Sequence, residues 1–198
     1  MKYSYIKFFE DKLKELSKES YVLDVGGGTP FQKGMAKYKD WFAGKRFVTI
    51  DKESAYHPDI IGDVHELPLK DEEVAAILCN AVLEHLYDPK RAVEEMYRVL
   101  MKGGKLLAYT HFIYPYHGRT GVYEDYFRFT ESGLRYLFRQ FSQVEVRKQG
   151  GFFTALMYFL PLISRIRVVA EPVAHILDWI FRTERRSTTA GFYVYAIK

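Results

Sequence analysis

Two groups of residues could together hold a nucleoside-like ligand. A short apolar segment ends in Asp24-Val25-Gly26-Gly27-Gly28, and the next apolar segment ends in Asp51. Glycines at the carboxyl end of a strand let a ligand approach the backbone closely, and a carboxylate at the end of the following strand can accept both hydroxyls of a ribose. Each feature alone has a simpler explanation, a tight turn or a solvated strand end. Their combination favours a nucleoside-binding site.

The spacing of the glycines argues against two common phosphate-binding sites. A dinucleotide fingerprint has the pattern Gly-x-Gly-x-x-Gly, but counting from Gly26 the third glycine position holds the bulky Phe31. A nucleotide-dependent oxidoreductase that uses NAD or FAD is therefore disfavoured. The chain also lacks the Gly-Lys-Ser/Thr of a P-loop. A nucleoside without a pyrophosphate remains, and S-adenosylmethionine is a ligand of this kind.

Alternating hydrophobic segments predict the elements that must position these residues. The N-terminal segment 1–19 contains an amphipathic helical pattern over residues 3–18. Strands are predicted at residues 21–25, 47–50, 60–61, 74–79, 105–110, 144–147 and 191–197. Helices are predicted from Pro30 onward, over residues 89–100 and after Thr130, which is a good N-cap. This order predicts an α/β fold, with a Rossmann-like, mostly parallel seven-stranded sheet and helices on both faces.

Two of the predicted helices carry specific expectations about their orientation and length. The helix that begins at Pro30 should turn Phe31, Met35 and Tyr38 toward the core. The helix over residues 89–100 should keep its charged residues, Glu95 among them, on the solvent side. It should stop at Lys102-Gly103-Gly104.

Five motifs follow one another in the order of a known family. They are Val-Leu-Asp-Val-Gly-Gly-Gly-Thr at 22–29, Thr-Ile-Asp at 49–51, and the segments 62–68, 80–89 and 98–104. Together they resemble a class I S-adenosylmethionine-dependent methyltransferase, of the methyltransferase type 11-like group, over roughly residues 20–150. The later segments 114–117 and 125–130 resemble a branch of small bacterial and archaeal enzymes thought to act on glycans or lipid-linked metabolites.

The resemblance implies how the first two strand ends would bind the cofactor S-adenosylmethionine, with S-adenosylhomocysteine as the product. Gly26 and Gly28 would pass beneath the methionine part, and Asp24 would steady their loop. Asp51 would bind the ribose hydroxyls. The sequence departs from the family pattern at Pro30, where many relatives have a third glycine. This changes the freedom of the turn but not the backbone atoms nearest the ligand.

The resemblance also implies cofactor contacts further along the chain. Lys52 would lie beside the adenine, and Asp63 would accept a hydrogen bond from the adenine amino group. The Val64 N–H would donate to the ring, and Asn80 would face the methionine and the donor methyl group. No metal site is expected.

Methyl transfer from a sulfonium needs a general base only when the acceptor has a proton to lose. By position at the carboxyl ends of the strands, the candidates are His85, His111, His117, Asp125 and Tyr126. His117 and Asp125 stand out because a histidine near an acid can serve as a base in the neutral range.

Structural explanations compete with these catalytic roles. His117 and Asp125 could instead fix their loop by hydrogen bonds, and His85 could pack against the following helix. Arg128, between two phenylalanines, could be structural or could bind an anionic group of the substrate.

Residues 150–190 form a hydrophobic insert where a minimal fold of this kind has a short hairpin. Two helical pieces are predicted there, broken at Pro161 and each too short to span a bilayer. The insert could cover the acceptor pocket, form a dimer interface, or lie in a membrane surface through residues 152–186, with Trp179 and arginines at the headgroups.

Bulk properties fit a single domain over residues 1–198. The chain is 48% hydrophobic and 27% charged, and its 17% aromatic content fits core packing or a pocket lining. The net charge of +4 and the absence of a basic stripe argue against nucleic acid as a partner. The lone Cys79 and the absence of a signal peptide are consistent with the cytoplasm, with membrane association through the insert.

The sequence thus predicts a methyltransferase, monomeric or homodimeric, that acts on a small-molecule, glycan or lipid-linked acceptor. The alternative is a scaffold or partner subunit that binds S-adenosylmethionine without turnover.

Overall fold

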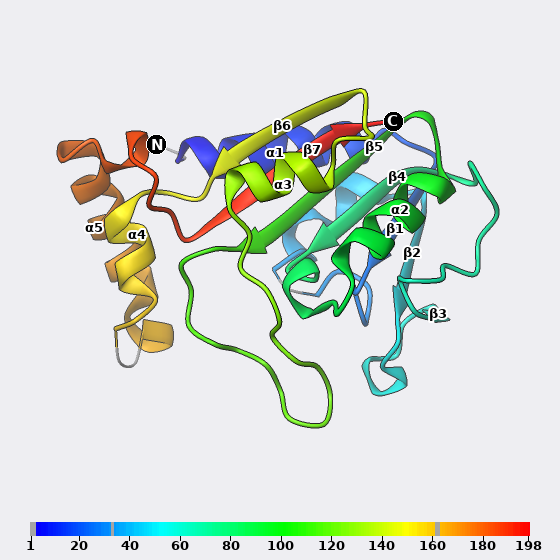
Figure 1. Ribbon diagram of the computed structural model, residues 1–198, viewed down its shortest axis with the longest axis horizontal. Coiled ribbons are helices and arrows are strands. Elements are labelled where there is room, and N and C mark those ends of the chain that lie inside the picture. The colour runs from blue at the N-terminus through cyan, green and yellow to red at the C-terminus, as the bar shows by residue number, and fades with distance from the viewer. Residues whose placement is uncertain (1–2, 33, 161–162) are drawn as a thin grey trace.

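The computed structural model describes residues 3–32, 34–160 and 163–198, and its centre is a seven-stranded β-sheet (Figure 1). The strands are β1 (Tyr21–Val25), β2 (Arg46–Asp51), β3 (Ile60–Ile61), β4 (Val74–Asn80), β5 (Leu100–His111), β6 (Gln143–Lys148) and β7 (Gly191–Ile197). Their spatial order is β3-β2-β1-β4-β5-β7-β6. Strands β1 to β5 are parallel, whereas β7 is antiparallel to both β5 and β6. The predicted mostly parallel sheet is confirmed.

Helices cover both faces of this sheet, and each face has its own hydrophobic core. On one face lie α1 (Ser4–Leu16) and the 3-10 helix η1 (Ala36–Phe42), which pack with Val22 of β1. On the other face lie α2 (Pro89–Val99) and α3 (Glu131–Leu137), which pack with Leu23 of the same strand. Successive side chains of a strand point to opposite faces, so one buried strand supplies both cores. Thr130 caps α3 as predicted, since its hydroxyl accepts the Gly133 N–H at 3.1 Å.

Among the residues that the structure describes, no helix begins at Pro30, where one was predicted. The first helical element after the glycine turn is η1, which starts at Ala36. Phe31 adopts a left-handed backbone conformation, with φ of 64°, and its ring stacks on Phe47 of β2 with the centroids 4.4 Å apart. The chain therefore bends away from a right-handed helix and partly buries this ring, through a long-range contact that local propensity does not encode. Met35 and Tyr38 are buried as expected, and Lys33 lies outside the described residues.

Two expectations about α2 are also wrong. Glu95 does not face solvent: it is 4% exposed and accepts hydrogen bonds from the Leu67 N–H and the Arg98 guanidinium. These partners are what make burial of a carboxylate tolerable. The helix ends at Val99, before the Gly103-Gly104 pair, because the backbone is already extended at Leu100 where β5 begins.

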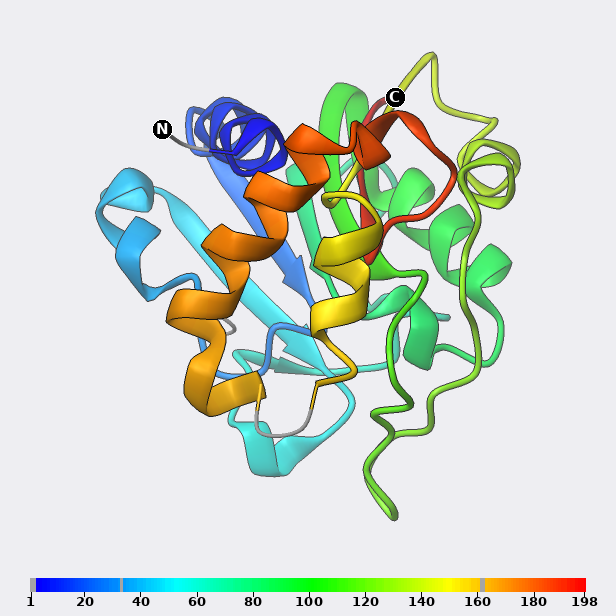
Figure 2. The same cartoon turned by 90° about the vertical axis from the view of Figure 1, so that its left-hand side faces the viewer.

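The insert between β6 and β7 contains two α-helices, as predicted. They are α4 (Phe152–Met157) and α5 (Ile163–Ile180), followed by the short 3-10 helix η4 (Thr183–Arg185), and they lie side by side beyond one edge of the sheet (Figures 1 and 2). Pro161, the predicted break, lies outside the described residues, whereas Pro172 is inside α5. Among the residues that the structure describes, no helix is long and apolar enough to cross a bilayer.

Candidate active site

The carboxyl ends of β1, β2 and β4 meet at one edge of the sheet and border a cavity of about 380 Å³. In the ladder, Val25 of β1 pairs with Ile50 of β2 and with Cys79 of β4. The Gly26 N–H then donates to the Ile50 carbonyl at 2.7 Å, so the glycine turn lies directly beside Asp51. Both features line the same cavity. This is the crevice in which open parallel sheets hold their ligands, where the strand order reverses between β1 and β4.

The glycine turn has the conformation and the space that only glycine provides. Gly26 and Gly28 have φ values of 65° and 56°. A Cβ on Gly26 would lie 2.6 Å from Val82, and one on Gly28 would lie 3.0 Å from Tyr56. The turn therefore presents bare backbone to the cavity, and a ligand there can approach the peptide groups closely.

Polar groups follow on from β2 and β3 along the cavity wall. The Asp51 carboxylate accepts the Glu53 N–H at 3.0 Å, and Lys52 and Val64 line the cavity beside it. Asp63 accepts the backbone N–H of His65 at 2.8 Å and contacts its Nδ1 at 2.5 Å. Partial burial opposes ionisation of Asp63, but the bonds from His65 outweigh it and lower the pKa of that carboxyl group. Both contacts are to Asp63 Oδ1, so within the described residues Oδ2 of this anion is left to accept a hydrogen bond from a ligand.

This wall also contains an aromatic pair that was not among the predicted site residues. The His65 ring stacks on Tyr87, with the centroids 4.0 Å apart and the planes inclined by 26°, and both residues line the cavity. His65 belongs to the motif segment 62–68 and Tyr87 to the motif segment 80–89, which follows η3 (Leu83–His85). Neither motif indicates that the two rings are in contact.

Two of the eight predicted cofactor residues lie just outside the cavity lining. Asp24 is 4% exposed inside β1, and its carboxylate would be 2.5 Å from a Cβ on Gly27, so it lies against the glycine turn. Asn80 ends β4, and the lining begins one residue later at Ala81. Ala81 adopts a left-handed conformation with φ of 54°, an uncommon backbone for a residue with a Cβ.

The loop over residues 111–129 forms the opposite wall. It contributes Val122, Tyr123 and Tyr126 to the lining. At its tip, Arg119 pairs with Tyr123 in a β-bridge and donates to the Tyr56 hydroxyl at 3.4 Å. The loop thereby reaches the segment that follows β2, from the other side of the cavity. None of the lining residues belongs to the 150–190 insert, so the expectation that the insert covers this pocket is not met by the residues that the structure describes.

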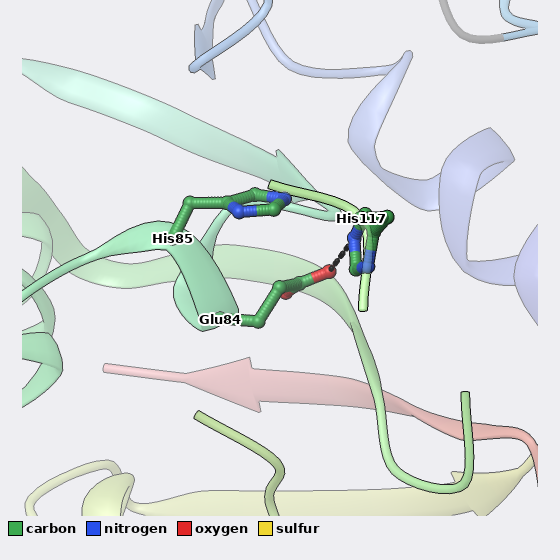
Figure 3. Close-up of side chains that lie close together, drawn as sticks. All are labelled: Glu84, His85 and His117. Carbon is green, nitrogen blue, oxygen red and sulfur yellow. Dashed lines mark ion pairs between the residues drawn. The ribbon is translucent and has the colours of Figure 1, made fainter. Parts of the chain in front are cut away.

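A buried carboxylate, Glu84, organises the histidines of this wall (Figure 3). Glu84 is completely buried in η3, where its two oxygens contact the Thr110 hydroxyl at 2.8 Å and His111 Nδ1 at 2.5 Å. Burial opposes its ionisation, but these contacts, above all that with His111, lower the pKa of Glu84. Its backbone carbonyl also accepts the Tyr126 N–H at 2.8 Å, which ties the loop to η3. Glu84 was not among the predicted site residues, because the sequence around an acid beside a histidine does not indicate that the acid is buried.

His117 lies next to this carboxylate, with Nε2 3.8 Å from the nearer Glu84 oxygen (Figure 3). Its Nδ1 is 3.2 Å from the Pro115 carbonyl, which fixes this nitrogen as the N–H donor in the neutral ring. Its Nε2 is buried, has no hydrogen-bond partner within the described residues, and so carries a free lone pair. Burial and the nearby charge of His111 outweigh Asp125 and lower the pKa of His117. His117 is therefore neutral and able to accept a proton at neutral pH.

Asp125 supports His117 without reaching the cavity. The Asp125 carboxylate accepts the His117 backbone N–H at 3.0 Å and lies 3.2 Å from His117 Nδ1. Arg128 holds both of its oxygens, at 2.5 and 2.6 Å. Although burial opposes ionisation, Arg128 and the His117 N–H lower the pKa of Asp125 to about 2. The fold thus brings His117 and Asp125 together, as predicted. Arg128 binds Asp125 with both guanidinium NH groups, which supports the structural explanation of this arginine.

His85 is the remaining predicted histidine, and it faces the cavity beside His117. Its Nδ1 contacts the Glu124 carbonyl at 2.7 Å, and its ring meets that of His117 edge-on at 4.8 Å. One ligand-type atom from each of Glu84, His85 and His117 lies within 4.8 Å of the others, so these side chains also have the chemistry of a divalent-cation site. The cluster of Glu84, His85 and His117 can therefore accept a proton at His117 Nε2 or bind a divalent cation.

Part of the chain matches a known protein family. Residues 23–108 match the family model of a methyltransferase domain. An uncharacterized protein of Methanocaldococcus jannaschii is 38% identical over 88 residues, which is 41% of this chain and 43% of that protein. This chain spans less than half the length of the curated relatives it matches.

Solved structures share the fold over nearly the whole chain. A SAM-dependent methyltransferase from Archaeoglobus fulgidus superposes with a TM-score of 0.61 at 14% identity, covering 99% of this chain and all of the other. Phosphoethanolamine N-methyltransferase 2 of Haemonchus contortus, crystallised with S-adenosyl-L-methionine, gives a TM-score of 0.62 at 14% identity, with 97% of this chain and 52% of that one covered. At this identity the likeness establishes the fold.

Proposed function

Because residues 23–108 match the family model of a methyltransferase domain and the chain shares its fold with solved S-adenosylmethionine-dependent methyltransferases, we propose that this protein transfers a methyl group from S-adenosylmethionine to an acceptor. The observation that carries the proposal is the adjacency of the Gly26–Gly28 turn and Asp51 on one cavity. A bare glycine turn beside a carboxylate suits an adenosine better than a phosphate, which would be repelled by Asp51 and Asp63.

The lining residues fit such a cofactor at both ends. The glycine turn lies where the methionine part would pass, and Asp51 is positioned to accept the ribose hydroxyls. Lys52, Asp63 and Val64 would surround the adenine. Asp24 would hold the glycine turn in place from behind the cavity lining. Asn80 would position Ala81, the next residue, which lines the cavity. When bound, the sulfonium supplies an activated methyl group, and the protein's task is to position the acceptor in line with it.

The acceptor would approach from the wall formed by the loop over residues 111–129. When a hydroxyl or amine of the acceptor attacks the methyl carbon, the acceptor must lose a proton. His117 Nε2 is the base we assign, and the imidazolium that forms lies between the carboxylates of Glu84 and Asp125. Two anions beside Nε2 and Nδ1 stabilise that cation as it develops. Tyr126 and His85 would contact the acceptor, since both line the cavity.

The acceptor class is proposed as a small molecule, a glycan or a lipid-linked metabolite. The aromatic wall formed by Tyr123 and Tyr126 suits an apolar or sugar face. The chain's modest charge gives no reason to invoke nucleic acid. We propose that the enzyme is cytoplasmic. A scaffold that keeps the cofactor without turnover is the second candidate, and only an assay of product S-adenosylhomocysteine separates the two.

Replacing Asp51 by alanine tests the cofactor assignment. The change removes the acceptor of two ribose hydroxyls, so the affinity for S-adenosylmethionine and S-adenosylhomocysteine should fall by about tenfold or more. Isothermal titration calorimetry measures both, and NAD should not bind. Asp11→Ala is the control, since Asp11 is a solvent-exposed acid on α1 that forms an ion pair with Lys7 of the same helix. Unchanged affinity in Asp51→Ala would show that the ribose lies elsewhere.

The pH dependence of turnover should report His117. The base is active when neutral, so the rate should rise with pH through the His117 pKa and then level off. Burial and the charges of His111 and His85 lower that pKa, so the inflection should lie below the ordinary histidine value of about 6.5. Glu84 and Asp125 stay ionised over this range because their pKa values are lowered. An inflection above the ordinary histidine value would contradict the assignment.

A further inference from the structure

Helix α5 has its polarity reversed relative to an ordinary surface helix. The side that faces the protein carries Glu171, His175 and Asp178. The side that faces outward carries aliphatic and aromatic residues, of which Val168 is 87% exposed and Trp179 is 78% exposed. A helix on a water-facing surface normally places these groups the other way round.

The polar contacts on the inner side fix this orientation. His175 Nε2 is 2.9 Å from the Tyr5 hydroxyl, which also donates to Glu171 at 3.1 Å. Asp178 is fully buried and accepts the N–H groups of Gly151 and Thr154 at 2.9 and 3.0 Å. If α5 rolled to bury its apolar side, these polar groups would lose their partners, at a cost of about 1–3 kcal/mol for each buried group left unpaired. The outward apolar side is therefore a stable feature of the fold.

The exposed apolar surface extends beyond α5. Neighbouring exposed residues come from α4, from the turn that follows it and from the end of α5, and they are Phe152, Leu156, Phe159, Leu160, Ile180 and Phe181. We call this surface, together with the outward side of α5, the insert face. Figure 2 shows α4 and α5 side by side, and the two helices are in contact, so their exposed apolar residues lie on neighbouring elements. A region of this size rarely stays in contact with water.

The charges around the insert face are mostly of one sign. The exposed arginines that have no ion pair within the described part of the insert are Arg165, Arg182, Arg185 and Arg186. Arg165 lies in the first turn of α5, and the other three lie just beyond its last turn. The exposed acid among the described residues of this region is Glu184. An apolar strip with cations at both ends complements an anionic bilayer surface, in which lipid tails receive the strip and headgroups receive the guanidinium groups.

The same arrangement argues against a second copy of this chain as the occupant. A two-fold interface brings the same patch of each subunit together. Antiparallel pairing of two α5 helices would place Arg165 of each against the arginine cluster of the other, and parallel pairing would place the two clusters together. Both pairings bring several cations close, with Glu184 as the exposed acid of each described cluster, so repulsion between the arginines dominates.

We propose that the insert face binds the surface of an anionic lipid bilayer. Resting on the methyl transfer proposed above, this placement makes the acceptor a membrane-borne amphiphile whose polar group enters the cavity. The link between the two sites is short: Tyr158, which follows α4, contacts the Tyr114 ring at 4.9 Å, and Tyr114 in turn contacts the His117 ring at 5.1 Å. The insert face and the catalytic loop thus share one packed connection.

Vesicle flotation of the whole chain tests the proposal. The protein should float with vesicles of phosphatidylcholine and phosphatidylglycerol in equal parts, and much less with phosphatidylcholine alone. Ile176→Glu, in the middle of the outward side of α5, should weaken binding by about tenfold or more. Tyr136→Glu, an exposed aromatic residue on α3, is the matched control and should bind like the wild type. Arg185→Gln and Arg186→Gln should each weaken binding by about fivefold.

Tryptophan emission gives a second readout that needs neither cofactor nor acceptor. The chain has two tryptophans, and Trp41→Phe leaves Trp179 as the reporter. Its emission should shift to shorter wavelength with anionic vesicles only. Failure to float, equal binding to neutral vesicles, or a stable dimer that does not bind vesicles would overturn the proposal. If Asp51→Ala bound S-adenosylmethionine as tightly as the wild type, the cofactor assignment would be wrong, but the vesicle-binding results would still stand. The two proposals can therefore be tested independently.

Discussion

Replacing His117 by asparagine is expected to lower turnover by about a hundredfold to ten-thousandfold, the usual contribution of a positioned base. Asparagine keeps an N–H donor near the Pro115 carbonyl but lacks the Nε2 lone pair, so the loop should stay in place while the base is lost. Affinity for S-adenosylmethionine should stay within about twofold, because His117 lies on the acceptor wall. Turnover is measured as S-adenosylhomocysteine released with a membrane and metabolite extract as the source of acceptor.

A matched variant and a chelator make this experiment decisive. His57→Asn removes an exposed histidine outside the cavity lining and should leave the rate unchanged. Wild-type activity in His117→Asn would exclude His117 as the base. Loss of wild-type activity after dialysis against a chelator, with recovery on adding zinc, would assign Nε2 to a cation held with Glu84 and His85 instead.

Replacing Asp178 by alanine should destabilise the insert by about 3–5 kcal/mol. The buried carboxylate accepts the N–H groups of Gly151, Phe153 and Thr154 at 2.8–3.0 Å, and the hydroxyls of Thr154 and Thr183 also donate to it. Alanine leaves three backbone donors at the start of α4 without partners. Hydrogen exchange should show fast exchange in α4 and α5 with slow exchange retained in the sheet.

The pH dependence of this stabilisation has a definite sign. Burial opposes ionisation of Asp178, but its hydrogen bonds outweigh it and lower its pKa in the folded state. Its contribution is therefore present above the unfolded aspartate value of about 3.9 and is lost as the pH falls through the lower folded pKa. Asp178→Asn keeps one acceptor oxygen and should be milder than alanine. Equal stability of alanine variant and wild type would mean that α4 is held by apolar packing alone.

The cofactor side of the site could be predicted from sequence because its geometry follows from local patterns. Apolar runs define β1 and β2, and parallel strands bring their carboxyl ends to one edge, so the Gly26–Gly28 turn and Asp51 must lie close together. The segment after the turn could not be predicted in the same way. The bend at Phe31 depends on stacking with Phe47, a contact that exists only in the folded sheet.

The acceptor side depends on burial and long-range contacts that sequence does not display. Glu84 becomes buried only when the loop over residues 111–129 folds back and the Tyr126 N–H reaches the Glu84 carbonyl. The spacing of apolar residues predicted two helices in the insert. That spacing shows that a segment is helical, but it does not show which side of the helix faces the protein. In α5 the polar side is the inner one because Asp178 and His175 find partners there.

The position of β7 has a consequence for biosynthesis. Although β7 follows all the other strands along the chain, it lies between β5 and β6 and supplies the hydrogen bonds of β6 in the sheet. While the polypeptide is still emerging from the ribosome, β6 and the helices α4 and α5 are synthesised before β7, so β6 has no strand to pair with until β7 is complete. The apolar insert is made during that interval, so contact with a lipid surface or a chaperone at that stage would protect the nascent protein from aggregation.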